Sequence, residues 1–234
     1  PGVRVCRDHK PIEDLVRFLG YNIRYPQHWY GDFLAQLGSL WTAETRVKSL
    51  CDRFGTNIVK GCFSEALNYG ERRMDEVIRK LPSADIEVSM TGEILEGFFP
   101  DGIPLKLRLK VLPEKGRIEF DYTDMPDQQK FGYNLTYATA RCSALQGTLA
   151  ALDPDIPNND GALKRITVKQ REGALAGIPR WPVGTSVATV ALCDEVTNLV
   201  LKAWAQVLPD KAMAGMGEYC AANYIGSGPS PTGE

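Results

Sequence analysis

The sequence predicts an α+β fold in which a long antiparallel helical hairpin is followed by an antiparallel β-sheet with packed helices. Three observations lead to this prediction: apolar residues recur at helical spacing through residues 1–82, alternate with polar residues between 105 and 122, and return to helical spacing at 137–152. Helices followed by a run of strands are typical of the α+β class. We expect a helical segment at 1–82, an α+β domain at 83–225 and a flexible tail at 226–234.

The first 82 residues are expected to form three helices. A short helix runs from Pro11 to Gly20, and Asp32 is expected to cap a long helix that ends at Gly55. A third helix follows from about residue 57 to residue 80 and is stopped by Pro82. The apolar stripes of the two long helices are Phe33, Leu37, Leu40, Val47, Cys51 and Phe54, and Val59, Phe63, Ala66, Met74, Val77 and Leu81. Two amphipathic helices joined by a short turn are expected to pack antiparallel.

The hydrophobic period then changes from 3.6 to 2, which indicates strands. Apolar residues at 105, 107, 109 and 111 alternate with Lys106, Arg108 and Lys110, so one face is expected to be buried and the other to be basic and solvated. Residues 118–122 alternate in the same way, and the turn residues at 113–116 between the two runs predict a hairpin. Ile86 and Val88 indicate a third strand before them.

The last third of the sequence returns to helices. A helix is predicted from Tyr137 to Leu152, followed by an acidic loop at 153–161 with two prolines. A short strand is predicted at 163–169, and residues 172–184 are rich in Gly and Pro. Ser186 is expected to cap a last helix that ends before Pro209.

Composition excludes several classes of protein. The chain has 234 residues, 27 Lys and Arg against 29 Asp and Glu, and 44% hydrophobic residues. These values exclude a disordered chain, which would combine low hydrophobicity with high net charge. They also argue against a general nucleic-acid binder, which would usually carry a basic excess. The sequence has no run of about 20 apolar residues. No pattern of a signal peptide is present, so we expect a cytoplasmic protein in which the six cysteines are reduced, buried thiols.

Familiar catalytic motifs are absent from the sequence. It contains no G-x-S-x-G, G-x-x-x-x-G-K-[ST], G-x-G-x-x-G or H-E-x-x-H pattern, and no C-x-x-C pair. Of its two histidines, His28 lies beside Trp29 and Tyr30, where an aromatic cluster is a better interpretation than a metal ligand. We predict no metal site made by this chain alone.

Three polar clusters are the candidates for a site. The loop with Asp153, Asp155 and Asn159 offers oxygen ligands for Mg²⁺ or Ca²⁺, although turn formation explains the same residues. Asp121 and Asp124 follow a predicted strand, which is a common binding position, although a solvated strand exit explains them too.

The third cluster is the segment 22–32 around Arg24. The guanidinium of Arg24 has the geometry to clamp a carboxylate or phosphate, and the alternative is a structural pair with Asp32.

Several of these segments together resemble the hydantoinase B / oxoprolinase family. The similarity lies in Asn22-x-Arg24-x-Pro26 with Gly31-Asp32-Phe-Leu-Ala-Gln36, in Tyr69-x-Glu71-Arg72-Arg73-Met74, in Phe120-Asp121-Tyr122-Thr123, in Gly132-Tyr-Asn134 and in Asp153-Pro-Asp155-Ile-Pro157-x-Asn159-x-Gly161. The last of these is the most specific, and the resemblance runs from about residue 16 to residue 220. The family's His- and Asp-rich N-terminal portion is not in the sequence, so we expect a fragment of such a subunit.

The resemblance implies a subunit of an ATP-dependent carboxylase complex that carboxylates a ketone such as acetophenone or acetone with bicarbonate. The alternative is a subunit of a cyclic-amide hydrolase of the hydantoinase or 5-oxoprolinase type, which the sequence also resembles, and a non-catalytic structural subunit is a third hypothesis. ATP and Mg²⁺ are expected on a hydantoinase A-type, actin-like ATPase partner, with a second hydantoinase B-type subunit in the complex. No nucleic acid or membrane is expected.

Within this resemblance, residue roles are assigned to the matching positions. Asn134, Asn159 and Arg24 are predicted catalytic residues, because amide and guanidinium donors stabilise a developing oxyanion. The predicted substrate-binding residues are Asp121, Asp124 and Asp155. Trp41, Trp181 and Trp204 are interface anchors under the structural hypothesis, with the hydrophobic core as the alternative.

Overall fold

The computed structural model describes residues 2–185 and 192–215, which form two compact units. Residues 1–65 make up the first unit and residues 66–234 the second, so that α3 runs from one into the other. The predicted cap at Ser186, the sixth cysteine Cys220 and the predicted tail at 226–234 lie outside the described residues. The predicted domain boundary at residue 82 stays a prediction.

The first unit is mostly helical. A tight turn joins two short antiparallel strands, and helices follow. Trp29 stacks on Phe33 at a ring-centroid distance of 5.4 Å, and Phe33 and Leu37 are buried. The elements are β1 (Cys6–Arg7), β2 (Lys10–Pro11), α1 (Glu13–Tyr21), α2 (Pro26–Phe54) and the beginning of α3 (Thr56–Ile78).

Two predictions for this unit are wrong. Asp32 does not cap α2, because the helix begins six residues earlier at Pro26, whose ring fixes a helical φ in the first turn. The predicted antiparallel packing of α2 on α3 is absent from residues 26–65, where Leu40, Phe54 and Phe63 are exposed. Only Gly55 (φ 88°) separates the two helices, whereas a helical hairpin needs a loop of about two to five residues.

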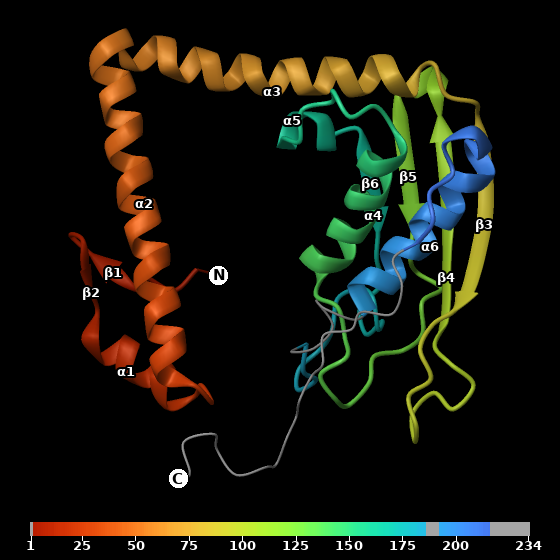
Figure 1. Cartoon of the computed structure of the whole chain (residues 1–234), viewed down its shortest axis with the longest axis horizontal. Helices are drawn as coiled ribbons and strands as arrows, with labels where there is room; N and C mark the ends of the chain where they lie inside the picture. Colours follow the sequence, from red (N-terminus) through yellow and green to blue (C-terminus); the bar gives the residue numbers. More distant parts are fainter. Residues whose placement is uncertain (1, 186–191, 216–234) are drawn as a thin grey trace. The chain divides into compact units, whose positions relative to one another are not determined.

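The second unit is built on a four-stranded sheet in the order β3-β4-β5-β6 (Figure 1). β3, β4 and β5 are antiparallel, as predicted, and Gly116 in the left-handed conformation closes the β4–β5 hairpin. The fourth strand pairs parallel to β5, so the sheet is mixed rather than antiparallel throughout. The strands are β3 (Ala84–Thr91), β4 (Pro104–Leu112), β5 (Arg117–Asp121) and β6 (Ile166–Lys169).

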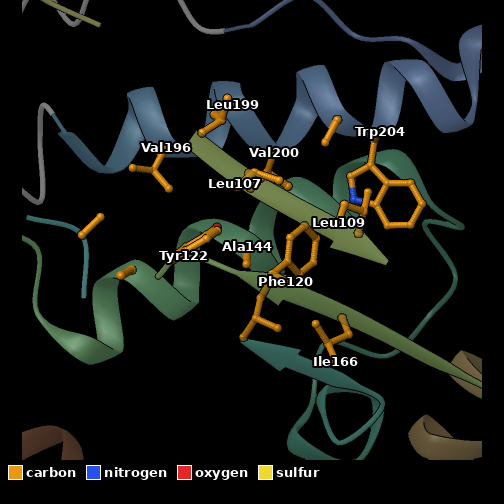
Figure 2. Close-up of a cluster of buried hydrophobic side chains, with 14 of the residues drawn as sticks. Leu107, Leu109, Phe120, Tyr122, Ala144, Ile166, Val196, Leu199, Val200 and Trp204 are labelled. Carbon is orange, nitrogen blue, oxygen red and sulfur yellow. The ribbon is translucent and has the colours of Figure 1, made fainter. Parts of the chain in front are cut away.

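Helices cover one face of this sheet. α4 (Tyr137–Ala151) and α6 (Leu192–Val207) lie over it (Figure 1), and α4 belongs to the crossover that a parallel β5–β6 pair requires. Trp204 and Val200 of α6 pack on Leu107 and Leu109 of β4 in the core (Figure 2). The α+β class predicted from the sequence is therefore confirmed.

The described cysteines are free thiols with different exposures. Cys193 is buried, but Cys62 and Cys142 are exposed, so the prediction that all the thiols are buried is wrong. Cys62 and Cys142 lie on helix faces that point to solvent. No helix within residues 2–185 and 192–215 has the length and apolar character needed to cross a membrane.

Candidate functional site

The polar face of the sheet is the candidate functional site. Alternate residues of β4 point to opposite faces: Leu105, Leu107 and Leu109 are buried under the helices, while Lys106 and Arg108 point to the other face. The sequence thus places acids and bases from adjacent strands side by side on one surface.

Three adjoining hollows lie on this surface. The first, about 610 Å³, lies where β3 ends and β4 begins, and Lys106 and Asp124 line it. A second of about 90 Å³ shares these two residues, and a third of about 480 Å³ shares Arg108 and Asp121 with the second. We call the three hollows together the sheet groove.

Ion pairs hold the basic side chains of the sheet groove in place. Lys106 Nζ lies 2.8 Å from Glu87 Oε1 and 3.8 Å from Asp124 Oδ2. Arg108 binds Asp85 with two hydrogen bonds, of 2.6 and 2.8 Å. The hydrogen bond to Glu87 raises the pKa of Lys106, so this ammonium stays charged at neutral pH.

Asp121 has the most constrained carboxylate of the predicted site residues. Its Oδ1 accepts hydrogen bonds from the backbone N–H and the hydroxyl of Thr123, and Oδ2 lies 3.1 Å from Lys169 Nζ. Partial burial would raise the pKa of Asp121, but the bonds from Thr123 and Lys169 outweigh burial and lower it. Asp121 is therefore an ionised acceptor and is not tuned for proton transfer near neutral pH.

The sheet groove therefore presents fixed charges of both signs. Lys106 offers a cation to a carboxylate or phosphate group, and Asp121 and Asp124 offer acceptors to donors on the same ligand. Such an arrangement suits binding and orientation of a small polar molecule. In the described ranges, no group of three or more His, Cys, Asp or Glu side chains is placed to hold a metal ion.

The acidic loop at 153–161 has a structural use. Asn159 caps α5 (Asp160–Leu163), because its Oδ1 accepts from the N–H of Ala162, and its Nδ2 donates to the backbone oxygen of Ala66 in α3. Gly161 lies so close to the backbone oxygen of Leu67 that a Cβ would clash with it. The loop therefore docks on α3 within the second unit. Asp155 is exposed beside it and does not line the sheet groove.

Asn134 is fully buried and its hydrogen-bonding capacity is used within the fold. Its Nδ2 lies 2.8–2.9 Å from the backbone oxygens of Gln129, Phe131 and Gly184, and its Oδ1 accepts from the N–H of Gln129 at 2.7 Å. Both amide protons are therefore engaged. In this conformation Asn134 holds two loops together and has no donor directed at a ligand.

Arg24 lies in the first unit, over the ring of Tyr25, with 5.6 Å between the guanidinium carbon and the ring centroid. No ion pair between Arg24 and Asp32 is present in the part of the chain that the structure describes. His28 is exposed and makes an edge contact with the ring of Tyr25, rather than with Trp29 or Tyr30.

The structure thus brings together two of the six predicted site residues, Asp121 and Asp124. Sequence reasoning missed the cations that face them, Lys106, Arg108 and Lys169. The alternation of charged with apolar residues in the strand at 105–111 was the available signal, but the same pattern is typical of any solvated sheet face.

Comparison with known proteins assigns the family. The family model for hydantoinase B/oxoprolinase matches residues 1–233. The chain is 26% identical over 219 residues to the B-type subunit of the putative D-/L-hydantoinase of Pseudomonas sp. (strain NS671), covering 88% of this chain and 36% of that protein.

The caprolactamase of Pseudomonas jessenii is similar in sequence and in structure. Its β subunit is 22% identical, over 98% of this chain and 39% of the subunit. The crystal structure of the ATP-dependent enzyme superposes with a TM-score of 0.76 at 21% identity, covering 90% of this chain and 36% of that chain.

The structure of nucleotide-free acetone carboxylase superposes with a TM-score of 0.74 at 12% identity, covering 91% of this chain and 30% of that chain. At this identity the similarity shows a shared fold alone. This chain spans little more than a third of the length of the curated relatives named above. The match of the family model along nearly the whole sequence shows that the chain belongs to the hydantoinase B/oxoprolinase family.

Proposed function

We propose that this chain is part of a hydantoinase B-type subunit of an ATP-dependent enzyme that opens a cyclic amide. The observation that carries the proposal is the activity named for two relatives that align with most of this chain, a hydantoinase and a caprolactamase. Hydantoin and caprolactam both contain an amide within a ring. The chemical class, rather than a particular ring, is therefore what we assign.

Ring amides resist attack by water, which explains the need for ATP. Transfer of a phosphoryl group from ATP to the amide oxygen, with ADP as product, would make the carbonyl carbon electrophilic. One water would add to this carbon and the ring nitrogen would leave as the amine, which gives an acyl phosphate. A second water would hydrolyse the acyl phosphate to the carboxylate and phosphate. We assign ATP and Mg²⁺ to a hydantoinase A-type partner, as the sequence resemblance described above implies.

In this proposal the sheet groove holds a polar part of the substrate or of a partner segment. Lys106 would bind its anionic group, while Asp121 and Asp124 would accept from its N–H or O–H donors. Asn134 and Asn159 would position loops, since the hydrogen bonds described above already engage their amide groups.

A ketone carboxylase is the second candidate, and it is the function that we predict from the sequence resemblance. There, bicarbonate would supply the carbon and an enolate of acetone or acetophenone would be the nucleophile. The two candidates share activation by ATP and differ in the bond that forms, carbon–oxygen in the hydrolase and carbon–carbon in the carboxylase.

The test is an assay of the complete complex, purified with its partner subunits. Phosphate release and product formation are measured with hydantoin, 5-oxoproline and caprolactam, and in parallel with acetone and acetophenone plus labelled bicarbonate. We expect ATP-dependent ring opening. Label in a carboxylated ketone, with every ring left intact, would refute the hydrolase and support the carboxylase.

A matched pair of variants tests the groove. Lys106→Ala removes the central cation, whereas Lys115→Ala changes an exposed lysine in the turn after β4. We expect the first to raise KM for the preferred substrate and the second to leave KM unchanged. Equal kinetics for both variants would remove the groove from the proposal.

A further inference from the structure

Three titratable side chains from distant segments meet beside the core of the second unit. Tyr133 Oη lies 3.1 Å from Glu93 Oε2 and 3.1 Å from Glu195 Oε1. Glu93 belongs to the loop between β3 and β4, Tyr133 precedes α4, and Glu195 is in the first turn of α6. Tyr133 is 5% exposed and Glu195 is 8% exposed.

The two 3.1 Å contacts of Tyr133 Oη can both be hydrogen bonds only if the cluster holds two protons. A phenol has one O–H and donates it to one acceptor, so Tyr133 cannot donate to both carboxyl groups at once. The other oxygen pair, also 3.1 Å apart, is a hydrogen bond only if that carboxyl is itself protonated. The cluster therefore needs a second proton, carried by one of the two glutamates.

The geometry favours Glu195 as the carrier. It is the more buried of the two. Burial raises the pKa of its carboxyl group and outweighs the hydrogen bonds from the Glu93 N–H and Tyr133, which lower it, while repulsion from Glu93 adds to the rise. Its Oε1 also accepts from the backbone N–H of Glu93 at 3.3 Å, which a carboxylic acid oxygen can do while donating to the phenol. Its Oε2 is buried without a hydrogen-bond partner.

We propose that Glu195, Tyr133 and Glu93 form a proton-dependent latch that fastens the loop at 92–103 to α6. In the closed state protonated Glu195 donates to Tyr133 Oη, and Tyr133 donates to the Glu93 carboxylate. Loss of the Glu195 proton leaves one phenolic O–H between two carboxylates, and the loop is released.

The charges around the cluster fit a latch that opens on deprotonation. Among the described residues, the groups that act on the Glu195 carboxyl are Glu93, from the loop, and Tyr133, from the segment before α4; no Lys or Arg is among them. A Cβ on Gly92 would clash with Glu195 Oε2, so the glycine allows the carboxyl to lie against the loop backbone. An ionised Glu195 would be without a cation to compensate it.

The loop carries apolar side chains, and one of them contacts the segment that holds Tyr133. Ile94 and Phe98 are exposed, and the ring of Phe98 lies 4.1 Å from that of Phe131, which is 6.1 Å from that of Tyr133. Opening at Tyr133 would separate the ring of Phe98 from that of Phe131 and free the loop from the segment before α4.

The pH dependence follows from linkage. The closed state holds the Glu195 proton more tightly than the open state, in which the carboxyl has its ordinary pKa of 4.5. The closed state is therefore favoured in acid. Opening increases by up to about tenfold per pH unit above the ordinary value and becomes constant once pH exceeds the raised pKa.

Hydrogen exchange of the complete protein between about pH 5 and about pH 8 tests the latch. After correction for intrinsic rates, we expect peptides that cover 92–103 to lose protection as pH rises, while peptides from β4 do not. Glu195→Gln keeps the shape and the neutral charge of the protonated acid but has no proton to lose, so protection of 92–103 in this variant is expected to be independent of pH. Glu96→Gln, at an exposed site in the same loop, is the control and should behave like wild type.

A second readout does not depend on loop opening. The infrared carbonyl band of a protonated carboxylic acid is expected in wild type above the pH at which surface carboxyls ionise, and should be absent from Glu195→Gln. Tyr133→Phe removes both phenolic bonds and is expected to lower protection of 92–103 at all pH values. A wild-type pH profile in Glu195→Gln, a band that survives in it, or unchanged protection in Tyr133→Phe would overturn the proposal.

Discussion

Replacing Asn134 distinguishes a structural amide from a catalytic one. In Asn134→Ala, the backbone oxygens of Gln129, Phe131 and Gly184 lose a donor and the N–H of Gln129 loses its acceptor. A buried group left without a partner costs about 1–3 kcal/mol. Phe131 keeps a bond from the N–H of Tyr133, which limits the total.

We expect a loss of about 3 kcal/mol in the free energy of unfolding, in a range of about 2–5 kcal/mol. For a protein of this size, that corresponds to a fall in Tm of about 6–12 °C. Asn134→Asp should cost more, because it directs a carboxylate at carbonyl oxygens. Asn158→Ala, at an exposed site, is the control and should stay within about 0.5 kcal/mol of wild type.

The assay is thermal and urea unfolding followed by circular dichroism, together with turnover of the complete complex. If Asn134→Ala unfolds like wild type but abolishes turnover, our structural interpretation is wrong. The prediction from sequence resemblance, which made Asn134 an oxyanion donor, would then be correct.

Three further predictions concern packing and charge. Trp204→Ala should cost about 3–5 kcal/mol because the ring is 2% exposed, whereas Trp181→Ala, at 94% exposed, should be neutral in the same unfolding assay. Gly161→Ala should destabilise through its clash with α3, but Gly38→Ala, in an open part of α2, should stabilise by about 0.5–1 kcal/mol; the reverse order would contradict the docking of the acidic loop. Asp121→Asn should lower stability at neutral pH by less than about 1 kcal/mol. Because the pKa of Asp121 is lowered on folding, this difference should fade as pH drops below the ordinary value of 3.8, and a difference that persists in acid would exclude its ionic origin.

Local patterns predicted most of the secondary structure. The alternation at 105–111 and the turn at 113–116 specify the β4–β5 hairpin, because burial of one strand face and the left-handed Gly116 are both local requirements. The parallel pairing of β6 was missed, since residues 122–165 separate it from β5 and no local pattern encodes strand direction. The helical hairpin was predicted wrongly because an amphipathic pattern shows only that one face of a helix is apolar. It does not show which element packs against that face.

The candidate site was harder to predict. Asp121 and Asp124 line the sheet groove, whereas the amide groups of Asn134 and Asn159 are hydrogen-bonded within the fold. The roles predicted for these four residues stay predictions. Asn, Asp and Gly are typical both of sites and of loops that must satisfy buried backbone groups. The sequence pattern alone does not separate these two uses.

The amino-acid sequence by itself determined the α+β class, the strand faces, the helix ends at glycine and proline, and the family. The strand faces and helix ends depend on chain neighbours a few residues apart, through backbone sterics and the period of burial, whereas the family depends on the order of motifs along the whole sequence. Tertiary structure alone decided which polar groups are free to act. The amide groups of Asn134 and Asn159 are hydrogen-bonded to loop and helix backbone, and Lys106 lies beside Asp124. Glu93, Tyr133 and Glu195 come from distant segments and lie within hydrogen-bonding distance. Whether a side chain binds a ligand or holds the fold depends on groups that lie tens of residues away.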